Sequence, residues 1–274
     1  MKRQFIHDLY SSFVLWFDHH LLYNGETYSN KNISLYPIKD DKLKAFSVYG
    51  SPYKQWNYDS SISGAQVPSG VWSNGNFIPR GQSGLKIDFN NGRVIFSGGV
   101  NIPISGQISP KEFNVYTTTQ SDQELLFEQR INLASEFPQQ PSGIPSDKVV
   151  APGIFIRFDA MTSQPFALGG EYLSKVTARA VILSESNFAL DGVGNLFADQ
   201  KQKNFLIIPK TPLNEFGDLK TGRYSYFEYL NQYFNQRELA YIEDVDFSKA
   251  ALTPNNPDLK VGFLDFKINL PRFV

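Results

Sequence analysis

The chain carries two short apolar runs that flank an Asn-Gly pair, in Leu85-Lys86-Ile87-Asp88-Phe89-Asn90-Asn91-Gly92-Arg93-Val94-Ile95-Phe96. Asn-Gly favours the left-handed backbone angles of a two-residue hairpin turn, so this segment predicts two antiparallel strands. With that turn, Phe89 lies opposite Val94. Four apolar side chains then share one face of the hairpin: Ile87, Phe89, Val94 and Phe96. We expect this face to be buried and the turn to point outward.

A second Asn-Gly pair, at residues 74 and 75, predicts another hairpin, with Trp72 opposite Phe77. The next pair away from that turn is Val71 and Ile78. Aromatic residues make up 15% of the chain, and 20 Gly and 16 Pro punctuate it, which favours strands and turns over helices. We therefore expect strands to dominate between residues 35 and 115.

Residues 2–22 read as one amphipathic helix. Large apolar side chains recur at spacings of three and four residues, at Phe5 or Ile6, Leu9, Phe13, Trp16 or Phe17, and Leu21. Polar residues such as Lys2, Ser12 and Asp18 occupy much of the opposite side, and Asn24-Gly25 ends the helix. The apolar stripe is buried either on its own domain or on a neighbouring subunit.

The alternation of apolar and polar residues is lost at 121–147. Within this segment the prolines between 138 and 145 exclude a regular element, so we expect the segment to be a loop or arm. Strands and two short helices follow, at 153–159, 173–183, 190–197 (helix), 205–208, 224–234 (helix), 239–247 and 259–270. The chain divides into an N-terminal helix and β-rich region at 1–120, the loop or arm at 121–147 and a C-terminal α/β region at 148–274, or it forms one domain.

These patterns predict an α+β, β-rich fold. It contains antiparallel sheets, an N-terminal amphipathic helix and a few short helices. Its 274 residues are enough to bury a substantial core.

Composition excludes several kinds of protein. The absence of cysteine excludes disulfides, thiolate metal sites and a thiol nucleophile. The 26 Lys and Arg against 27 Asp and Glu give a formal net charge of -1, so nucleic acid is disfavoured as the main ligand. No run of about 20 apolar residues is present, and the first residues lack the features of a signal peptide, so we expect neither a membrane span nor export.

The residue types that catalysis needs are not clustered in the sequence. All three histidines, His7, His19 and His20, fall within the predicted helix, and we expect them to be surface or half-buried side chains. The sequence has no Gly-x-Ser-x-Gly elbow and no phosphate-binding glycine loop. We therefore expect no catalytic residues, no metal and no cofactor, and a protein that is not an enzyme.

The densest acidic group consists of Glu243, Asp244 and Asp246. On a strand, Asp244 and Asp246 project from the same face. Such a pair can bind a divalent cation or act as a glycosidase couple. The favoured interpretation is a solvated strand edge, where charges discourage unwanted pairing with other strands.

Five aromatic residues crowd a turn-rich region near Asn57 and Asp59: Tyr49, Tyr53, Trp56, Tyr58 and Trp72. One hypothesis is a noncatalytic carbohydrate-binding module, since rings stack on sugars while amides bind their hydroxyls. The alternative is that these rings are core or interface anchors. The candidate contacts to a partner protein are Tyr53, Trp56, Tyr58 and Arg93. Arg93 follows the predicted turn, where its guanidinium is either solvated or bridges to a carboxylate of a neighbouring subunit.

Residues 84–96, Gly-Leu-Lys-Ile-Asp-Phe-Asn-Asn-Gly-Arg-Val-Ile-Phe, resemble a strand-turn-strand segment of neck and tail proteins in the virions of tailed bacteriophages. The strand at 176–183, the helix at 190–197 and the closing strand at 264–268 are similar in layout to ring-forming connector and tail-completion proteins. The resemblance covers part of the chain and includes no diagnostic motif. These families have no catalytic residues to carry over.

The resemblance implies a structural virion protein, a ring-forming subunit that helps to connect head and tail. Its expected partners are further copies of itself and portal, neck or tail subunits, and its expected location is the virion, assembled in the host cytoplasm. The charged fraction of 19% and the many tyrosines agree with surfaces that partners cover. The alternative function is the carbohydrate-binding module.

Overall fold

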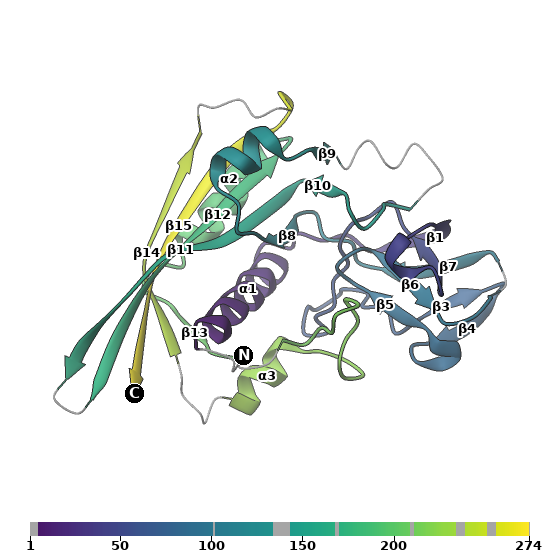
Figure 1. Cartoon of the computed structure of the whole chain (residues 1–274), viewed down its shortest axis with the longest axis horizontal. Helices are drawn as coiled ribbons and strands as arrows, with labels where there is room; N and C mark the ends of the chain where they lie inside the picture. The colour runs from purple at the N-terminus through teal and green to yellow at the C-terminus, as the bar shows by residue number, and fades with distance from the viewer. Residues whose placement is uncertain are drawn as a thin grey trace.

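The computed structural model of the chain describes residues 5–100, 102–133, 143–167, 170–208, 211–233, 239–250 and 256–273. Figure 1 shows two β-sheet regions with the N-terminal helix α1 (Phe5–Tyr23) between them. The other described helices are α2 (Asn187–Ala198), α3 (Tyr226–Tyr233) and short turns at Asp41–Leu43, Gln82–Gly84 and Glu124–Glu128. The β-rich α+β fold that the sequence predicts is confirmed.

One sheet has seven strands in the order β4-β3-β7-β1-β2-β6-β5. Neighbouring strands in it are antiparallel. Its strands are β1 (Lys31–Ile38), β2 (Ser47–Gly50), β3 (Gly70–Ser73), β4 (Asn76–Pro79), β5 (Lys86–Asp88), β6 (Arg93–Phe96) and β7 (Ile104–Ile108).

The second sheet has six strands in the order β13-β14-β15-β12-β11-β8. Its strands are β8 (Asn114–Thr117), β11 (Gly153–Ala167), β12 (Glu171–Ser184), β13 (Asn204–Leu206), β14 (Leu239–Lys249) and β15 (Lys260–Phe273). β8 runs parallel to β11, which departs from the purely antiparallel sheets expected. A separate parallel pair is formed by β9 (Ile131–Leu133) and β10 (Val149–Ala151).

The hairpin of β5 and β6 has a different register from the predicted one. Ile87 pairs with Val94 and Asp88 with Arg93, which leaves residues 89–92 as the loop. The pairing is shifted by two residues. Because successive side chains of a strand point to opposite faces, a shift by two leaves every side chain on the face of the hairpin that was predicted for it. The expected burial is confirmed, at 0 to 1% exposure, for Ile87, Phe89, Val94 and Phe96.

The side chain of Asp88 explains the longer loop. The type I′ turn that Asn-Gly favours needs positive φ at both Asn91 and Gly92, and of the two only Gly92 has it, at 58°. Asp88 instead accepts hydrogen bonds from the Asn91 backbone N–H at 3.1 Å and from its side-chain amide at 2.8 Å. The turn that we expected to point outward is partly covered: Asn90 is exposed, Asn91 is half-buried and Gly92 is buried, and Asn90 and Asn91 line a cavity of the protein.

The hairpin of β3 and β4 forms as predicted. Both cross-strand pairs are present: Trp72 with Phe77, and Val71 with Ile78. Here Asn74 and Gly75 both have positive φ, at 47° and 81°, as the two-residue turn requires. The Asn-Gly signal therefore specifies the turn type at this site.

α1 is buried on most of its sides rather than along one stripe. Its apolar side packs on the six-stranded sheet and on α2, where the ring centroids of Phe17 and Phe197 lie 3.9 Å apart. The side expected to be polar is also covered, since Ser12 and Asp18 are 0% and 3% exposed. Of the two alternatives predicted for the apolar stripe, burial within its own chain is confirmed. No helix in the described ranges is at once long enough and apolar enough to pass through a bilayer.

The predicted loop or arm at 121–147 contains regular structure. Glu124–Glu128 form a turn of π-helix, and Ile131–Leu133 form β9. Leu125 and Leu126 are buried against the six-stranded sheet, which explains why this segment is ordered. The loop or arm expected at 121–147 thus holds two short elements within 124–133. Residues 134–142, which include Pro138 and Pro141, lie outside the described residues, so the absence of a regular element at 138–145 stays a prediction.

One hydrophobic cluster joins the two regions on either side of this segment. It contains Leu9 of α1, Phe96 of β6 and Phe266 of β15. The regions 1–120 and 148–274 thus share a core, with α1 at its centre.

Candidate functional site

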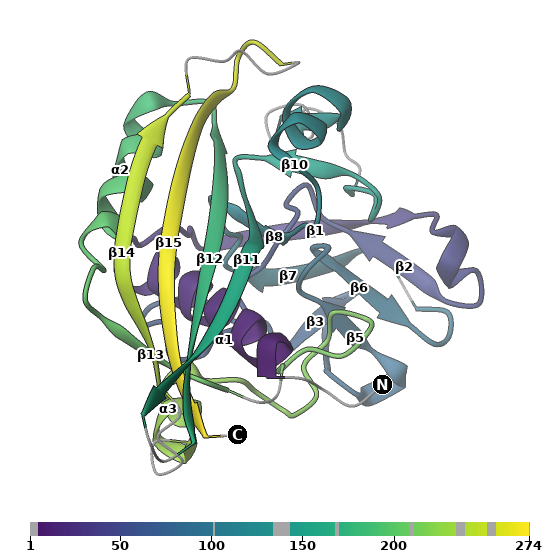
Figure 2. The ribbon, with the colours of Figure 1, turned by 60° about the vertical axis from the view of Figure 1, so that its left-hand side comes forward.

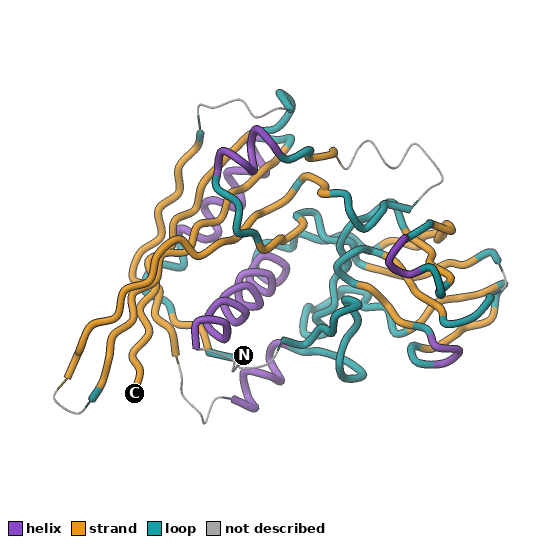
Figure 3. The backbone as a smooth tube through the Cα atoms, in the orientation of Figure 1, coloured by secondary structure: helices purple, strands orange, loops and turns teal. Residues whose placement is uncertain are grey.

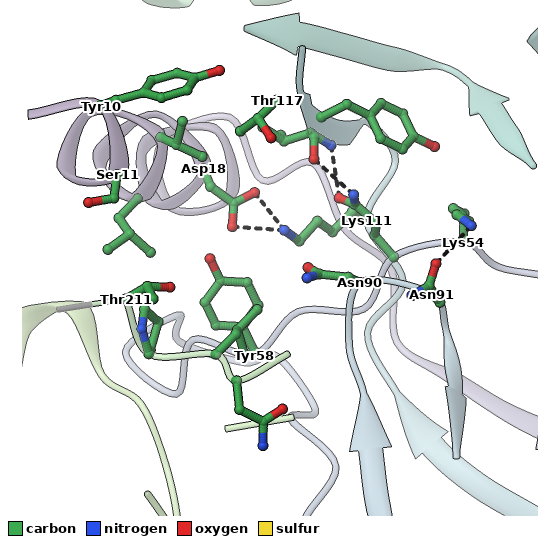
Figure 4. A pocket seen from close by; sticks show the side chains of 18 of the residues that line it. Tyr10, Ser11, Asp18, Lys54, Tyr58, Asn90, Asn91, Lys111, Thr117 and Thr211 are labelled. Atoms are coloured by element: carbon green, nitrogen blue, oxygen red, sulfur yellow. Dashed lines mark hydrogen bonds and ion pairs between the residues drawn. The ribbon is translucent and has the colours of Figure 1, made fainter. Parts of the chain in front are cut away.

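A cavity of about 710 Å³ lies beside α1, where segments from both sheet regions meet (Figure 4). α1 contributes Tyr10, Ser11 and Asp18 to its lining, and the turn between β5 and β6 contributes Asn90 and Asn91. Other segments supply the remaining labelled side chains: Lys54, Tyr58, Lys111, Thr117 and Thr211. We call this space the central cavity.

An ion pair between Asp18 and Lys111 forms part of the wall. Lys111 Nζ donates to both carboxylate oxygens of Asp18, at 2.6 and 2.8 Å, and the two side chains are 5% and 4% exposed. Tyr58 lies beside this pair, with its ring centroid 5.0 Å from Lys111 Nζ. Burial, followed by the nearby Asp18 carboxylate, raises the pKa of Tyr58 well above its ordinary value. The pair therefore ties α1 to the segment that follows β7.

Lys54 is a second buried cation at the cavity, and the residue is 5% exposed. Its ammonium donates to Asn91 Oδ1 at 3.0 Å and to the backbone carbonyl oxygens of Ser146 at 3.0 Å and Pro145 at 3.4 Å. Burial lowers the pKa of Lys54 to about 8, and the nearest carboxylates reverse only part of this effect. Lys54 thus holds the β5–β6 turn against the segment before β10.

We expect Lys54 to lose its proton near pH 8, well below the 10.5 of an ordinary lysine. Between these two values the unfolded chain holds the proton and the folded chain does not, so the cost that this group imposes on folding falls as the pH rises through that window. Below about pH 8, burial of the charged ammonium lowers the free energy of unfolding by its full amount. NMR titration of protein with 13C-labelled lysine, assigned with Lys54→Met, measures this pKa, and a value near 10.5 would contradict the burial argument.

The charged groups of the central cavity limit its chemistry. Lys54, Lys111 and Lys148 line it together with the carboxylate of Asp18, so its charge favours an anion and its volume suits a small molecule. Because Lys111 holds Asp18 and three oxygens hold the Lys54 ammonium, these groups tie segments together and are not poised as an acid–base pair. Within the described ranges, no three His, Asp or Glu side chains gather where they could hold a metal ion.

His19 and His20 are more buried than the sequence predicts, at 7% and 9% exposure. His19 Nδ1 lies 2.7 Å from Asp59 Oδ2, while Asp59 Oδ1 accepts hydrogen bonds from the Ser61 hydroxyl and the Tyr226 backbone N–H. Burial opposes ionisation of Asp59, but these hydrogen bonds outweigh it and lower the pKa of that carboxyl. The pair joins α1 to the loop at 57–61 and to α3.

Arg93, predicted as a partner contact or a solvated turn charge, lies inside the protein at 6% exposure. Its Nε donates to Asp88 Oδ2 at 2.8 Å, and its Nη1 donates to Asp40 Oδ2. The physical reason is the changed register, which places Arg93 directly opposite Asp88 instead of opposite Asn90. A solvated turn charge is therefore wrong, and Arg93 joins β6 to β5 and to the segment after β1.

The other candidate partner contacts also offer little surface. Trp56 is 0% and Tyr58 7% exposed, and Tyr53 is half-buried. Tyr49 belongs to the core as well, whereas Trp72 lies on the outer face of β3. The five aromatic residues are therefore not gathered on one surface that a sugar could reach, and their burial does not support the predicted contacts.

The acidic residues of β14 are paired at the surface. Lys201 Nζ lies 2.6 Å from Asp244 Oδ1, and Lys267 Nζ lies 3.0 Å from Asp244 Oδ2 and 3.7 Å from Asp246 Oδ2. Hydrogen bonds from Lys201 and Lys267 lower the pKa of Asp244 to about 2. With Glu243 and Asp246 exposed, this arrangement supports the solvated strand surface over the cation site.

The sequence did not predict that the residues of the central cavity lie together, because they are far apart in the chain. Asp18 and Lys111 are separated by 93 positions. One signal pointed to the pair: Asp18 interrupts an apolar run of the helix, and a buried carboxylate requires a partner. The sequence does not indicate which of 26 basic residues supplies it.

No model of a known protein family matches the chain, and no curated protein matches it either.

Proposed function

We propose that the chain is a structural subunit of a tailed-phage virion, one that forms a ring in the neck or tail and helps to connect head and tail. The resemblance of residues 84–96 and of the layout between 176 and 268 supports this role. The partners are then further copies of the chain and portal, neck or tail subunits. The proposed location is the virion, and no enzymatic activity is part of the proposal.

A projecting β-hairpin is the observation that carries this proposal. β11 and β12 extend beyond the body of the molecule beside the C-terminal end of β15 (Figures 1 and 2). β8 covers only Gly153–Ile156 of β11, and the remaining outer edge of that strand pairs with no other strand in the described part of the chain. Residues 160–165 there are exposed and uncharged. Such an edge can accept a strand from another chain.

The surface at the start of α2 offers a second contact. Phe188 lies in the first turn of this helix and is 89% exposed. The helix end itself is well ordered, because the Ser186 side chain accepts hydrogen bonds from the backbone N–H groups of Phe188 and Ala189. Met161, on the hairpin, is 46% exposed. Aromatic and methionine side chains are enriched at protein interfaces. A contact between two different surfaces of successive copies closes into a ring when the rotation between copies allows it.

Sedimentation velocity over a range of concentrations tests the proposal, and we expect a discrete closed oligomer. Thr162→Lys places a charge on the open edge of β11 and is expected to shift the population toward monomer, as is Phe188→Asp. Gln123→Lys adds the same charge at an exposed residue outside the hairpin and serves as the matched control.

The proposal is wrong if the chain stays monomeric at every concentration and mass spectrometry also fails to find it in purified particles. Assembly that Thr162→Lys and Phe188→Asp leave unchanged would show that neither surface is the contact.

A further inference from the structure

The outward face of the seven-stranded sheet carries a row of side chains that crosses four adjacent strands. The register aligns them in this order: Phe77 of β4, Trp72 of β3, Ser105 of β7 and Ser34 of β1. Two residues further along β7 and β1, Gln107 lies opposite Asn32. The intervening residues on these strands are buried in the core, among them Leu35, Val71 and Ile104, so this row faces outward.

An aromatic platform forms one end of the row. The ring centroids of Trp72 and Phe77 lie 5.0 Å apart, and Phe77 is 45% exposed. Gly70 of β3 allows the Phe77 ring to lie across its strand, because a Cβ at Gly70 would be 2.7 Å from Cζ of that ring. The sheet thus presents aromatic surface to solvent at a defined position.

A groove of about 340 Å³ runs beside this platform. Its polar lining consists of Asn32, Ser34, Ser105 and Gln107, and Trp72 lines it as well. None of the residues that line it is charged. Amides and hydroxyls both donate and accept hydrogen bonds, and on neighbouring strands they are spaced about 5 Å apart. The groove therefore offers an aromatic surface followed by a line of neutral donors and acceptors.

We propose that this groove binds a neutral oligosaccharide. A sugar ring presents C–H groups, which pack on an aromatic face, and hydroxyls at its rim, which pair with amides and hydroxyls. A phosphorylated or carboxylated ligand fits less well, because no lining cation would balance its charge, and nucleic acid needs such cations for its phosphates. This site shares only Trp72 with the aromatic cluster considered from the sequence, and it does not depend on the proposed virion role.

Binding is tested first on an array of neutral oligosaccharides built from α- and β-linked hexoses and pentoses. Intrinsic tryptophan fluorescence then follows titration with the best binder. Trp16 and Trp56 are 7% and 0% exposed, so the sugar-dependent change reports on Trp72.

Titration calorimetry compares the variants. We expect Trp72→Ala to weaken binding at least about tenfold and Gln107→Ala about threefold. The matched control is Phe227→Ala, which truncates an exposed aromatic side chain on α3, 39% exposed, and is expected to leave binding unchanged.

Failure of every oligosaccharide on the array to bind at about 10 mM overturns the proposal, as does binding that neither Trp72→Ala nor Gln107→Ala weakens. If Trp72→Ala changes the oligomeric state in sedimentation and no sugar binds, the face is a contact between copies of the chain, and the oligosaccharide proposal is wrong. Weakened sugar binding with unchanged sedimentation supports the groove independently of assembly.

Discussion

Arg93→Met is expected to lower the free energy of unfolding by about 3–5 kcal/mol, because it leaves buried carboxylates without their cation. Asp88, at 1% exposure, would keep only its hydrogen bonds within the turn. Asp40 depends on the same guanidinium. Burial by itself raises the pKa of the Asp40 carboxyl, but its hydrogen bonds, of which the one from Arg93 has the largest effect, lower the pKa overall. Urea denaturation followed by circular dichroism measures the loss.

A matched control separates this effect from the general loss of a positive charge. Arg223 pairs with Glu228 at the surface, where their side chains are 67% and 58% exposed, so Arg223→Met is expected to cost no more than about 1 kcal/mol. Adding Asp88→Asn to Arg93→Met should restore part of the stability. Equal, small losses in the two single variants would contradict a buried role for Arg93.

Phe17→Ala is expected to cost about 3–5 kcal/mol, through lost transfer free energy and the cavity left behind. Phe17 is 0% exposed, and its ring stacks on Phe197 of α2, with the centroids 3.9 Å apart, and meets Phe266 of β15 edge-on at 6.1 Å. The substitution thus removes one of the side chains through which α1 contacts both α2 and the six-stranded sheet. Thermal or urea unfolding of the purified variant measures the effect.

Phe188→Ala provides the comparison, because this ring is 89% exposed. Its loss is expected to change the free energy of unfolding by no more than about 0.5 kcal/mol. Should Phe17→Ala prove as mild as Phe188→Ala, α1 would not be the centre of the core.

The sequence by itself determined the elements whose cause is local. Asn74-Gly75 has the positive φ angles of its predicted turn, and the helix predicted at 190–197 forms as α2, which begins at Asn187 after the Ser186 cap. The face shared by Ile87 and Val94 was predictable although the register was not, because a shift by two residues leaves an alternating pattern unchanged. Hydrophobic periodicity and turn preferences depend on residues that are only a few positions apart, so these features can be predicted without knowledge of the tertiary structure.

Tertiary structure alone decided which polar residues are buried and what they meet. Asp18 finds Lys111, and Lys54 finds the carbonyl oxygens of Pro145 and Ser146. These partners are separated by about ninety positions or more, and a charge enters the interior only where folding brings a matching group to it. The outward row that begins at Trp72 likewise exists only once β4, β3, β7 and β1 are aligned, because strand order and register set which side chains become neighbours.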